Sequence, residues 1–265
     1  MTTDRYAVIG NPISHSLSPR IHSAFAEEMQ ESLSYSTVKA ELNNFVSRAS
    51  EFFEDGGAGL NVTVPFKFEA HGWIENLDKH ARQAGAVNTI KFSDGILAGY
   101  NTDGLGLVRD LSHMNWEVNG ARILIVGAGG ATAGIIGPLI DAGSQITITN
   151  RTLSKADKLA KKNPDISVCT REASRQDWDI VINATSAGLT GNADIVPKEA
   201  IENARCYDLI YGLSAYTPFV QWASDIALEV SDGLGMLIEQ AAEAFFLWRG
   251  VRPTTTHLAE TLRHA

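Results

Sequence analysis

A glycine-rich stretch at residues 123–131 carries the residue types that bind phosphate groups. It reads Ile-Leu-Ile-Val-Gly-Ala-Gly-Gly-Ala, so an apolar, β-branched run typical of a buried strand leads into a tight turn. A helix that begins at such a turn points its free N–H groups and the positive end of its dipole at an anion. The stretch therefore predicts a cradle for the phosphates of a dinucleotide, made by Gly127, Ala128, Gly129, Gly130 and Ala131.

The spacing departs from the usual G-x-G-x-x-G pattern, because Thr132 stands at the third glycine position. The alternative is a turn that serves packing alone, but the expected strand before it and helix after it favour a nucleotide site. Residues 123–140 are also uncharged and long enough to suggest a membrane span. The glycines after the β-branched run, together with Pro138, favour strand, turn and helix instead.

Residues 150–155 follow the next expected strand and indicate which dinucleotide is bound. An NAD site normally places Asp or Glu here, on the ribose hydroxyls, and this segment contains neither. After Asn150, the side chains of Arg151, Thr152 and Lys155 offer a guanidinium, a hydroxyl and an ammonium, which suit the 2′-phosphate of NADP. The alternative is a solvated helix start, where cations would be slightly unfavourable. We therefore predict NADP as the cofactor.

The composition excludes several function classes. The chain has 265 residues, 44% of them hydrophobic, and a net charge of −9, so we expect a globular protein that binds a small molecule and neither nucleic acid nor a membrane. Its two cysteines, Cys169 and Cys206, lack metal-site spacing, as do the seven histidines, and no metal is expected. The apolar run at the N-terminus is too short for a secretory leader. We expect a cytoplasmic monomer or homodimer without structural disulfides.

The elements that must position these residues fall into groups along the chain. Residues 1–101 alternate strands and helices and then form a hairpin, which predicts an α/β domain with a mixed sheet. Its expected strands are 6–10, 34–40, 59–64, 87–92 and 96–100. Its expected helices are 44–55, 78–84 and one that ends near Met29, with Ser18 as the N-cap before Pro19.

Residues 102–236 have the pattern of a Rossmann-type domain, beginning with a helix at 101–115. Six strands are expected, at 122–126, 145–149, 167–169, 179–183, 205–209 and 228–231, with helical crossovers between most of them. Residues 237–265 form the third segment. We expect its helices, at 235–249 and 254–264, to return to the first domain and pack on it.

Seven motifs, in the same order over nearly the whole chain, resemble the shikimate dehydrogenase family. They are Gly-Asn-Pro-Ile-Ser-His-Ser-Leu-Ser-Pro at 10–19, Asn-Val-Thr-Val-Pro-Phe-Lys at 61–67, Gly-Ala-Val-Asn-Thr at 85–89, Asn-Thr-Asp at 101–103, Asn-Arg-Thr at 150–152, Asn-Ala-Thr-Ser-Ala-Gly at 183–188 and Gly-Leu-Gly-Met-Leu-Ile-Glu-Gln at 233–240. The resemblance implies an oxidoreductase that reversibly reduces 3-dehydroshikimate to shikimate with NADPH, in chorismate and aromatic amino-acid biosynthesis. The first domain would then bind the substrate and the second NADP.

The resemblance also implies that Lys67 and Asp103 form the catalytic pair. Reduction of a ketone by hydride requires a proton for the developing alkoxide, and an ammonium group can supply it. A neighbouring carboxylate would hold the ammonium in position and keep it charged until the alkoxide forms. Without the resemblance, Lys67 would be interpreted as a surface lysine and Asp103 as an ordinary acid in a first helical turn.

The remaining site residues are implied in the same way. Ser16 and Ser18 resemble the pair that binds the substrate carboxylate, in a loop that His15 is expected to order. Residues expected on the ring hydroxyls are Thr63, Asn88, Asp103 and Gln240, where an unpaired partner would be costly. Residues expected toward the nicotinamide are Tyr211, which also approaches the carboxylate, the carbonyl of Leu209 and the backbone of Gly233.

Three alternatives stay open from the sequence. A paralogue could act on quinate, or on both acids, and accept NAD, although the missing acid after the second strand argues against NAD. A non-enzymatic NADP-binding regulator could share the scaffold, but it would not need Lys67 and Asp103. A folate-linked dehydrogenase of similar two-domain shape would not need the serine and asparagine set.

Overall fold

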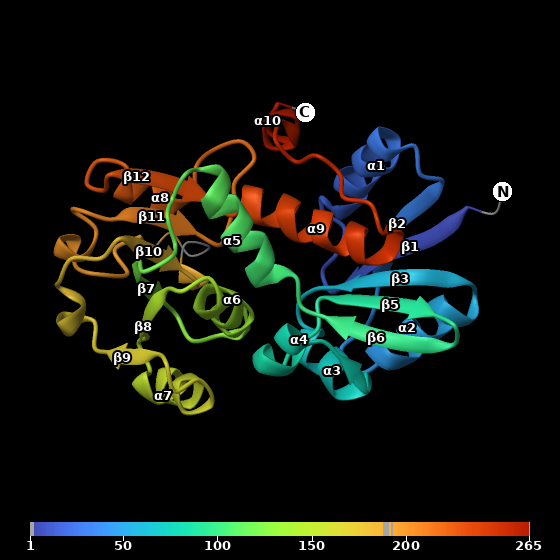
Figure 1. Cartoon of the computed structure of the whole chain (residues 1–265), viewed down its shortest axis with the longest axis horizontal. Helices are drawn as coiled ribbons and strands as arrows, with labels where there is room; N and C mark the ends of the chain where they lie inside the picture. The colour runs from blue at the N-terminus through green and yellow to red at the C-terminus, as the bar shows by residue number, and fades with distance from the viewer. Residues whose placement is uncertain (1–2, 188–190, 192, 265) are drawn as a thin grey trace. The chain divides into compact units, whose positions relative to one another are not determined.

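The computed structural model describes residues 3–187, 191 and 193–264 (Figure 1). The chain divides into two compact units. The first unit contains Met1–Gly106 and Ile238–Leu258, and the second contains Leu107–Leu237 and Ala259–Ala265. Within the described residues, no helix has the length and apolar character needed to cross a membrane. The uncharged stretch 123–140 is instead the strand, turn and helix expected from its glycines.

The first unit is built on a mixed, six-stranded sheet with the order β2-β1-β3-β5-β6-β4. Its strands are β1 (Asp4–Gly10), β2 (Leu33–Lys39), β3 (Gly57–Val62), β4 (Asn76–Leu77), β5 (Thr89–Ser93) and β6 (Ile96–Tyr100). Strands β2 and β3 run parallel to β1, whereas β5 and β6 form the predicted antiparallel hairpin. Asp94 and Gly95 both have positive φ in its two-residue turn, which suits the right-handed twist of the strands.

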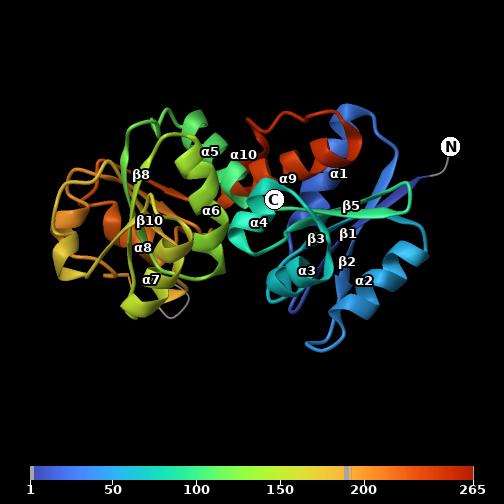
Figure 2. The ribbon, with the colours of Figure 1, turned by 60° about the horizontal axis from the view of Figure 1, so that its bottom comes forward.

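Helices cover both faces of this sheet, as Figure 2 shows, with α1 and α9 on one side and α2 and α3 on the other. The helices are α1 (Ser18–Met29), α2 (Phe45–Glu54), α3 (Lys67–Trp73), α4 (Lys79–Ala84) and, from Ile238 onward, α9 (Leu234–Arg249). Alternation along β1 divides the core: Ala7 packs toward the α2 side, and Tyr6 stacks on Trp248 of α9 at 4.6 Å. The part of α9 from Ile238 onward is therefore an integral part of the first unit.

The second unit is built on six parallel strands with the order β12-β11-β10-β7-β8-β9. They are β7 (Arg122–Val126), β8 (Gln145–Thr149), β9 (Ser167–Cys169), β10 (Ile180–Asn183), β11 (Arg205–Asp208) and β12 (Glu229–Asp232). This is the doubly wound order, in which the direction of winding reverses between β7 and β10. The predicted Rossmann-type fold and the mixed first sheet are both confirmed.

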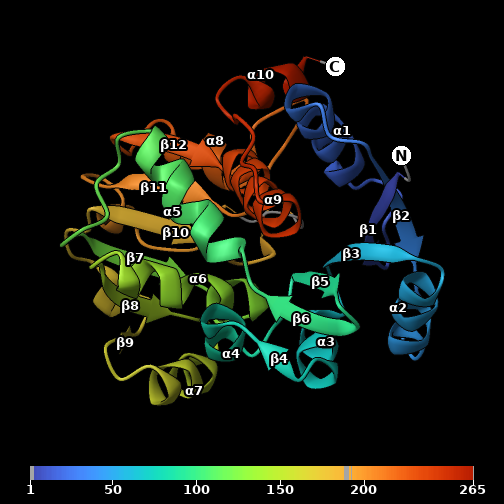
Figure 3. The ribbon, with the colours of Figure 1, turned by 45° about the vertical axis from the view of Figure 1, so that its right-hand side comes forward.

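Alternate residues of these strands face two separate cores. Ile123 and Ile125 pack toward α5 (Asp103–His113), α6 (Gly130–Asp141) and α7 (Leu153–Lys162). Leu124 and Val126 pack toward α8 (Pro218–Ala223) and the short 3-10 helix Lys198–Ala200. A second 3-10 turn, Glu172–Ser174, follows β9. Figure 3 shows α5 and α6 on the first of these faces. Cys206 is buried on the second face.

The final helix differs from the expectation. Helix α10 (Leu258–Arg263) is shorter than the predicted 254–264, and residues from Ala259 onward group with the second unit. Only the segment from Ile238 to Leu258 returns to the first unit. Polar contacts attach α10 to the second unit. Arg263 donates hydrogen bonds to Asp232 and to the carbonyl of Gly212, which both belong to that unit.

Candidate active site

Lys67 and Asp103 lie in direct contact in the first unit, with Nζ 2.6 Å from Oδ2. Lys67 is the first residue of α3, and Asp103 is the first residue of α5. Their side chains are 27% and 12% exposed, so the pair is partly shielded from water while the ammonium stays accessible. A charged pair with this geometry can hold a proton on Nζ and release it to an oxygen atom nearby.

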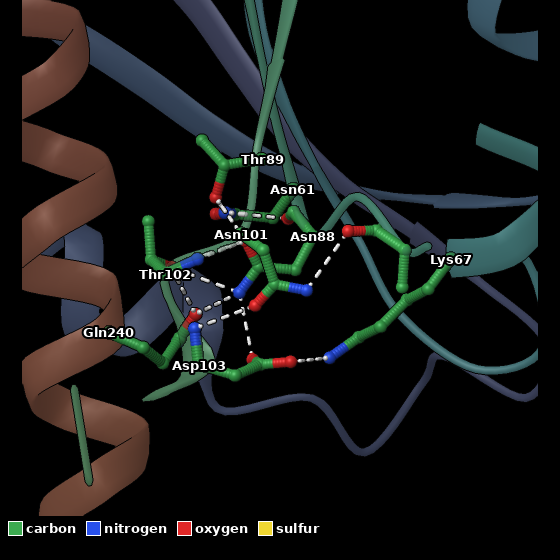
Figure 4. A network of polar contacts seen from close by, with 9 residues as sticks. Asn61, Lys67, Asn88, Thr89, Asn101, Thr102, Asp103 and Gln240 are labelled. Carbon is green, nitrogen blue, oxygen red and sulfur yellow. Dashed lines mark hydrogen bonds and ion pairs between the residues drawn. The ribbon is translucent and has the colours of Figure 1, made fainter. Parts of the chain in front are cut away.

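Asn88 fixes the carboxylate of Asp103 from the other side (Figure 4). Its Nδ2 donates to Oδ1 of Asp103 at 2.8 Å and to the hydroxyl of Thr102 at 2.9 Å, and its Oδ1 accepts the Thr102 amide at 2.9 Å. Gln240 of α9 approaches the same Nδ2 at 3.4 Å. Asn88 is 2% exposed. Both oxygens of Asp103 therefore have a donor, and its orientation is set before any ligand binds.

A second layer of buried polar groups supports Asn88, and sequence reasoning did not single out its members. Thr89 donates its hydroxyl to Oδ1 of Asn88 at 2.9 Å, and Asn61 donates to Thr89 at 3.0 Å. The hydroxyl of Tyr35 donates to Oδ1 of Asn61 at 2.7 Å. Asn101 accepts the amide of Asp103 at 3.2 Å. Three of these residues lie inside the quoted motifs, so membership of a motif is the feature of the sequence that could have identified them.

The loops that carry Ser16, Ser18 and Thr63 leave the same edge of the first sheet, because β1 and β3 are adjacent and parallel. The amide of Asn11 donates to the carbonyl of Val64 at 3.1 Å and joins the two loops. Thr63 is half-buried, and Ser18 is 8% exposed. The sheet topology therefore places both segments at one edge of the first sheet, and the roles of these side chains stay predictions.

The predicted N-cap at Ser18 is wrong. Helix α1 begins at Ser18. Its N-cap residue is Leu17, whose side chain forms no capping hydrogen bond. The amide of Ser18 instead donates to the hydroxyl of Ser16 at 3.3 Å. The hydroxyl of Ser16 therefore accepts a hydrogen bond from one of the free amides at the helix start. The exposed imidazole of His15 lies in the same loop.

His22 lies in α1 and is 1% exposed. Its ring stacks on Tyr35 with centroids 4.2 Å apart, and neither ring nitrogen has a hydrogen-bond partner among the described residues. Burial lowers the pKa of His22 to about 3, because the charged form would be desolvated. His22 is therefore neutral at physiological pH and packs as an aromatic ring.

The glycine-rich turn between β7 and α6 has the geometry of a phosphate cradle. Gly127 has φ +118°, and a Cβ there would lie 2.9 Å from the carbonyl oxygen of Ala184. Gly129 is the N-cap of α6, and a Cβ there would meet no atom within 4 Å. The first glycine is thus required by the backbone, while the second leaves open space where a phosphate can approach. The turn fits the pyrophosphate of a dinucleotide.

Thr132 explains why the third glycine is dispensable here. Its side chain is fully buried, and its hydroxyl donates to the carbonyl of Gly127 at 2.9 Å. The hydroxyl thus closes the turn from inside the helix, a contact that a third glycine could not make. The departure from the usual pattern is therefore compatible with the nucleotide site.

The segment at 150–155 follows β8 and includes the start of α7. Arg151, Thr152 and Lys155 are exposed, and Asn150 folds back to donate to the carbonyl of Thr152 at 2.8 Å. The three predicted phosphate ligands lie together at one helix end. They follow β8, which neighbours β7 in the sheet, so both predicted phosphate sites lie at the same sheet edge.

The residues expected toward the nicotinamide gather where β11 and β12 end. Gly233 packs so closely that a Cβ would lie 2.4 Å from the carbonyl oxygen of Leu209. Tyr211 follows two residues later in the chain than Leu209, and burial raises its pKa. Burial also raises the pKa of Asp208 to about 6. Of the motif at 183–188, Asn183 bonds to Asp208 at 3.0 Å, and Gly188 lies outside the described residues.

Models of protein families match three parts of the chain. Residues 8–90 match the shikimate dehydrogenase substrate binding domain. Residues 110–208 match shikimate / quinate 5-dehydrogenase, and residues 233–263 match the shikimate 5′-dehydrogenase C-terminal domain.

Individual proteins agree with these matches. The shikimate dehydrogenase (NADP(+)) of Marinobacter nauticus is 46% identical over 274 residues, with 99% of each chain covered. The crystal structure of an Ael1 enzyme from Pseudomonas putida is similar with a TM-score of 0.93 at 39% identity, covering 98% of each chain. Shikimate 5-dehydrogenase from Thermus thermophilus, solved with NADP(H) and shikimate, has a TM-score of 0.89 at 32% identity and covers 99% of each chain. The chain belongs to the shikimate dehydrogenase family.

Proposed function

We propose that this protein is an NADP-dependent shikimate dehydrogenase, which reduces 3-dehydroshikimate to shikimate and catalyses the reverse reaction. The observation that carries the proposal is the 2.6 Å contact between Lys67 and Asp103, held by Asn88. Relatives that match almost the whole chain are named shikimate dehydrogenase (NADP(+)), and one similar structure was solved with NADP(H) and shikimate.

In the proposed mechanism, Lys67 supplies the proton. NADPH, when bound, supplies the hydride. The Nζ of Lys67 gives its proton to the carbonyl oxygen of the substrate as that oxygen becomes an alkoxide. Asp103 holds the ammonium through Oδ2 and stabilises its charge, and Asn88 keeps Oδ1 turned away from Lys67. In the oxidation of shikimate, Lys67 receives the proton of the hydroxyl group.

The other substrate contacts are those that the family resemblance implies, and the character of each side chain supports them. Ser16 and Ser18, at the start of α1, would bind the carboxylate, because hydroxyls and free helix amides both favour an anion. Tyr211 would approach the same carboxylate. The residues proposed for the ring hydroxyls are Thr63, Asn88, Asp103 and Gln240, whose amides, hydroxyl and carboxylate can discriminate among hydroxyl positions.

The cofactor contacts follow the edge of the second sheet. The backbone of 127–131 would bind the pyrophosphate, since the open side of Gly129 admits it. The 2′-phosphate would lie among Asn150, Arg151, Thr152 and Lys155, because residues 150–155 after β8 contain no acidic side chain. The nicotinamide end would contact Leu209 and Gly233.

A spectrophotometric assay tests the proposal. Purified protein should reduce NADP+ when shikimate is added, with a higher kcat/KM for NADP+ than for NAD+ and for shikimate than for quinate. A preference for quinate would support the alternative substrate, which the name of the family model for residues 110–208 includes. A protein that binds NADPH and never oxidises it with 3-dehydroshikimate would be a regulator instead.

A further inference from the structure

The segment after β11 carries Tyr211, and the next residue is held on both sides by charged groups. The N–H of Gly212 donates to Oδ2 of Asp232 at 3.3 Å, and the carbonyl of Gly212 accepts from Nη1 of Arg263 at 2.5 Å. A Cβ at Gly212 would lie 2.0 Å from the carbonyl oxygen of Ala215, so the turn that follows is tight. The position of the Tyr211 backbone therefore depends on two side chains from distant parts of the chain.

Asp232 and Arg263 form the pair that makes these contacts. The carboxylate of Asp232 is 0% exposed at the end of β12, and its Oδ1 accepts both the amide of Leu234 and Nη2 of Arg263, the latter at 2.5 Å. A buried carboxylate requires a counter-charge, and Arg263 supplies it. The planar guanidinium can then reach the carboxylate with one nitrogen and the Gly212 carbonyl with the other.

We propose that Arg263, in the C-terminal helix α10, is a positioning residue for Tyr211 and acts through Gly212 and Asp232. The inference rests on the proposed function, in which Tyr211 contacts substrate and nicotinamide. Without the guanidinium, the Gly212 carbonyl loses its donor, and Asp232 keeps a buried charge opposite Asp208, its register partner in β11. The segment that contains Tyr211 would then keep the bond from the Gly212 amide to Asp232 and lose the second of its two anchors.

The same two strands provide a matched control. Arg205 begins β11 and bonds to Glu229, which begins β12, with Nε 2.8 Å from Oε1. Arg205 and Glu229 are also register partners, three residues before Asp208 and Asp232. Arg205→Met thus removes an arginine–carboxylate pair from these strands, at the end remote from Tyr211. Arg263→Met removes the pair with Asp232, at the end of the strands that leads into Tyr211.

Kinetics test the functional half of the inference. We expect Arg263→Met to lower kcat/KM for shikimate about tenfold relative to Arg205→Met, the effect of one lost charge-assisted hydrogen bond. Arg263→Lys, which keeps the charge but has a single nitrogen, should recover part of this loss. Binding of adenosine 2′,5′-bisphosphate should be equal in all variants, because its expected site follows β8 in the other half of the sheet. Equal kcat/KM for the two Met variants of an active enzyme would overturn the inference.

Amide hydrogen exchange at Gly212 tests the structural half without catalysis. The amide should exchange faster in Arg263→Met than in the wild type and in Arg205→Met, because its segment loses an anchor. If the wild type never reduces NADP+ with shikimate, the proposed function fails and the exchange measurement alone decides whether Arg263 positions this segment. Equal exchange in all three proteins would then overturn it.

Discussion

The backbone of Gly127 has φ +118°, and a Cβ atom at this position would lie 2.9 Å from the carbonyl oxygen of Ala184. Gly129, two residues later, has an extended backbone with φ −102°, and a Cβ atom there would have no neighbour within 4 Å. The two glycines of the turn therefore serve different purposes. One is needed for folding, and the other keeps space for a ligand.

Alanine at each position should separate these purposes. Gly127→Ala should lower the free energy of unfolding by about 1–3 kcal/mol, because the backbone conformation is strained for alanine. Gly129→Ala should leave the free energy of unfolding unchanged and weaken NADPH binding, since its methyl group would enter the space for the pyrophosphate. Urea unfolding and a binding titration measure the two effects. Undiminished NADPH affinity in Gly129→Ala would argue against a phosphate site at this turn.

The predicted 2′-phosphate site can be tested by reversing one charge. Arg151→Asp should raise KM for NADP+ by about tenfold to a hundredfold, since a charge-assisted contact is replaced by repulsion. KM for NAD+ should change much less. Lys161→Asp, in the last turn of helix α7, which follows Arg151, changes the net charge equally and should leave both constants near wild type. If Arg151→Asp resembles Lys161→Asp in KM for NADP+, Arg151 does not bind the 2′-phosphate.

His22 should make the first unit sensitive to acid. Its pKa is about 3 in the folded state, below the ordinary value of 6.5, so the unfolded chain binds the extra proton between these pH values. Stability from this group is complete above pH 6.5 and is lost as pH falls toward 3. Between pH 7 and pH 5, wild type should lose about 2 kcal/mol more free energy of unfolding than His22→Phe.

The control for this experiment is His264→Gln, because His264 is exposed. That variant should show the pH dependence of the wild type. Denaturant unfolding at the two pH values provides the measurement. Parallel losses in wild type and His22→Phe would mean that His22 can be protonated in the folded protein at little cost.

Much of this fold follows from local sequence. The strands of the second unit lie within a residue or so of their expected positions, because their short apolar runs are bounded by polar or glycine-containing segments. Helix α3 was not predicted, since its seven residues include Gly72 and are too few for a periodic signal. The cap at Ser18 was wrong because the helix begins one residue earlier than expected, so that Ser18 is its first residue and its amide donates to the hydroxyl of Ser16.

The site required information that local patterns do not contain. Tyr35 and Asn61 meet only because β2 and β3 flank β1, and Asn88 meets Asp103 only after the hairpin has folded. The motifs of the family pointed to Asn88 and Asp103 without showing the bonds between them. The attachment of α10 to the second unit depends on Arg263, which no motif includes.

The central claim is that Lys67, held by Asp103, supplies and receives the proton. Lys67→Ala removes the ammonium and leaves the backbone bond from the Val87 amide to the Lys67 carbonyl in place. The exposed Lys39, which pairs with Glu41, provides the control Lys39→Ala. Steady-state kinetics of shikimate oxidation with NADP+ should show kcat lowered by about 100-fold to 10,000-fold in Lys67→Ala, with a much smaller change in KM for shikimate. A Lys67→Ala enzyme whose kcat stays within a few-fold of Lys39→Ala would contradict the account.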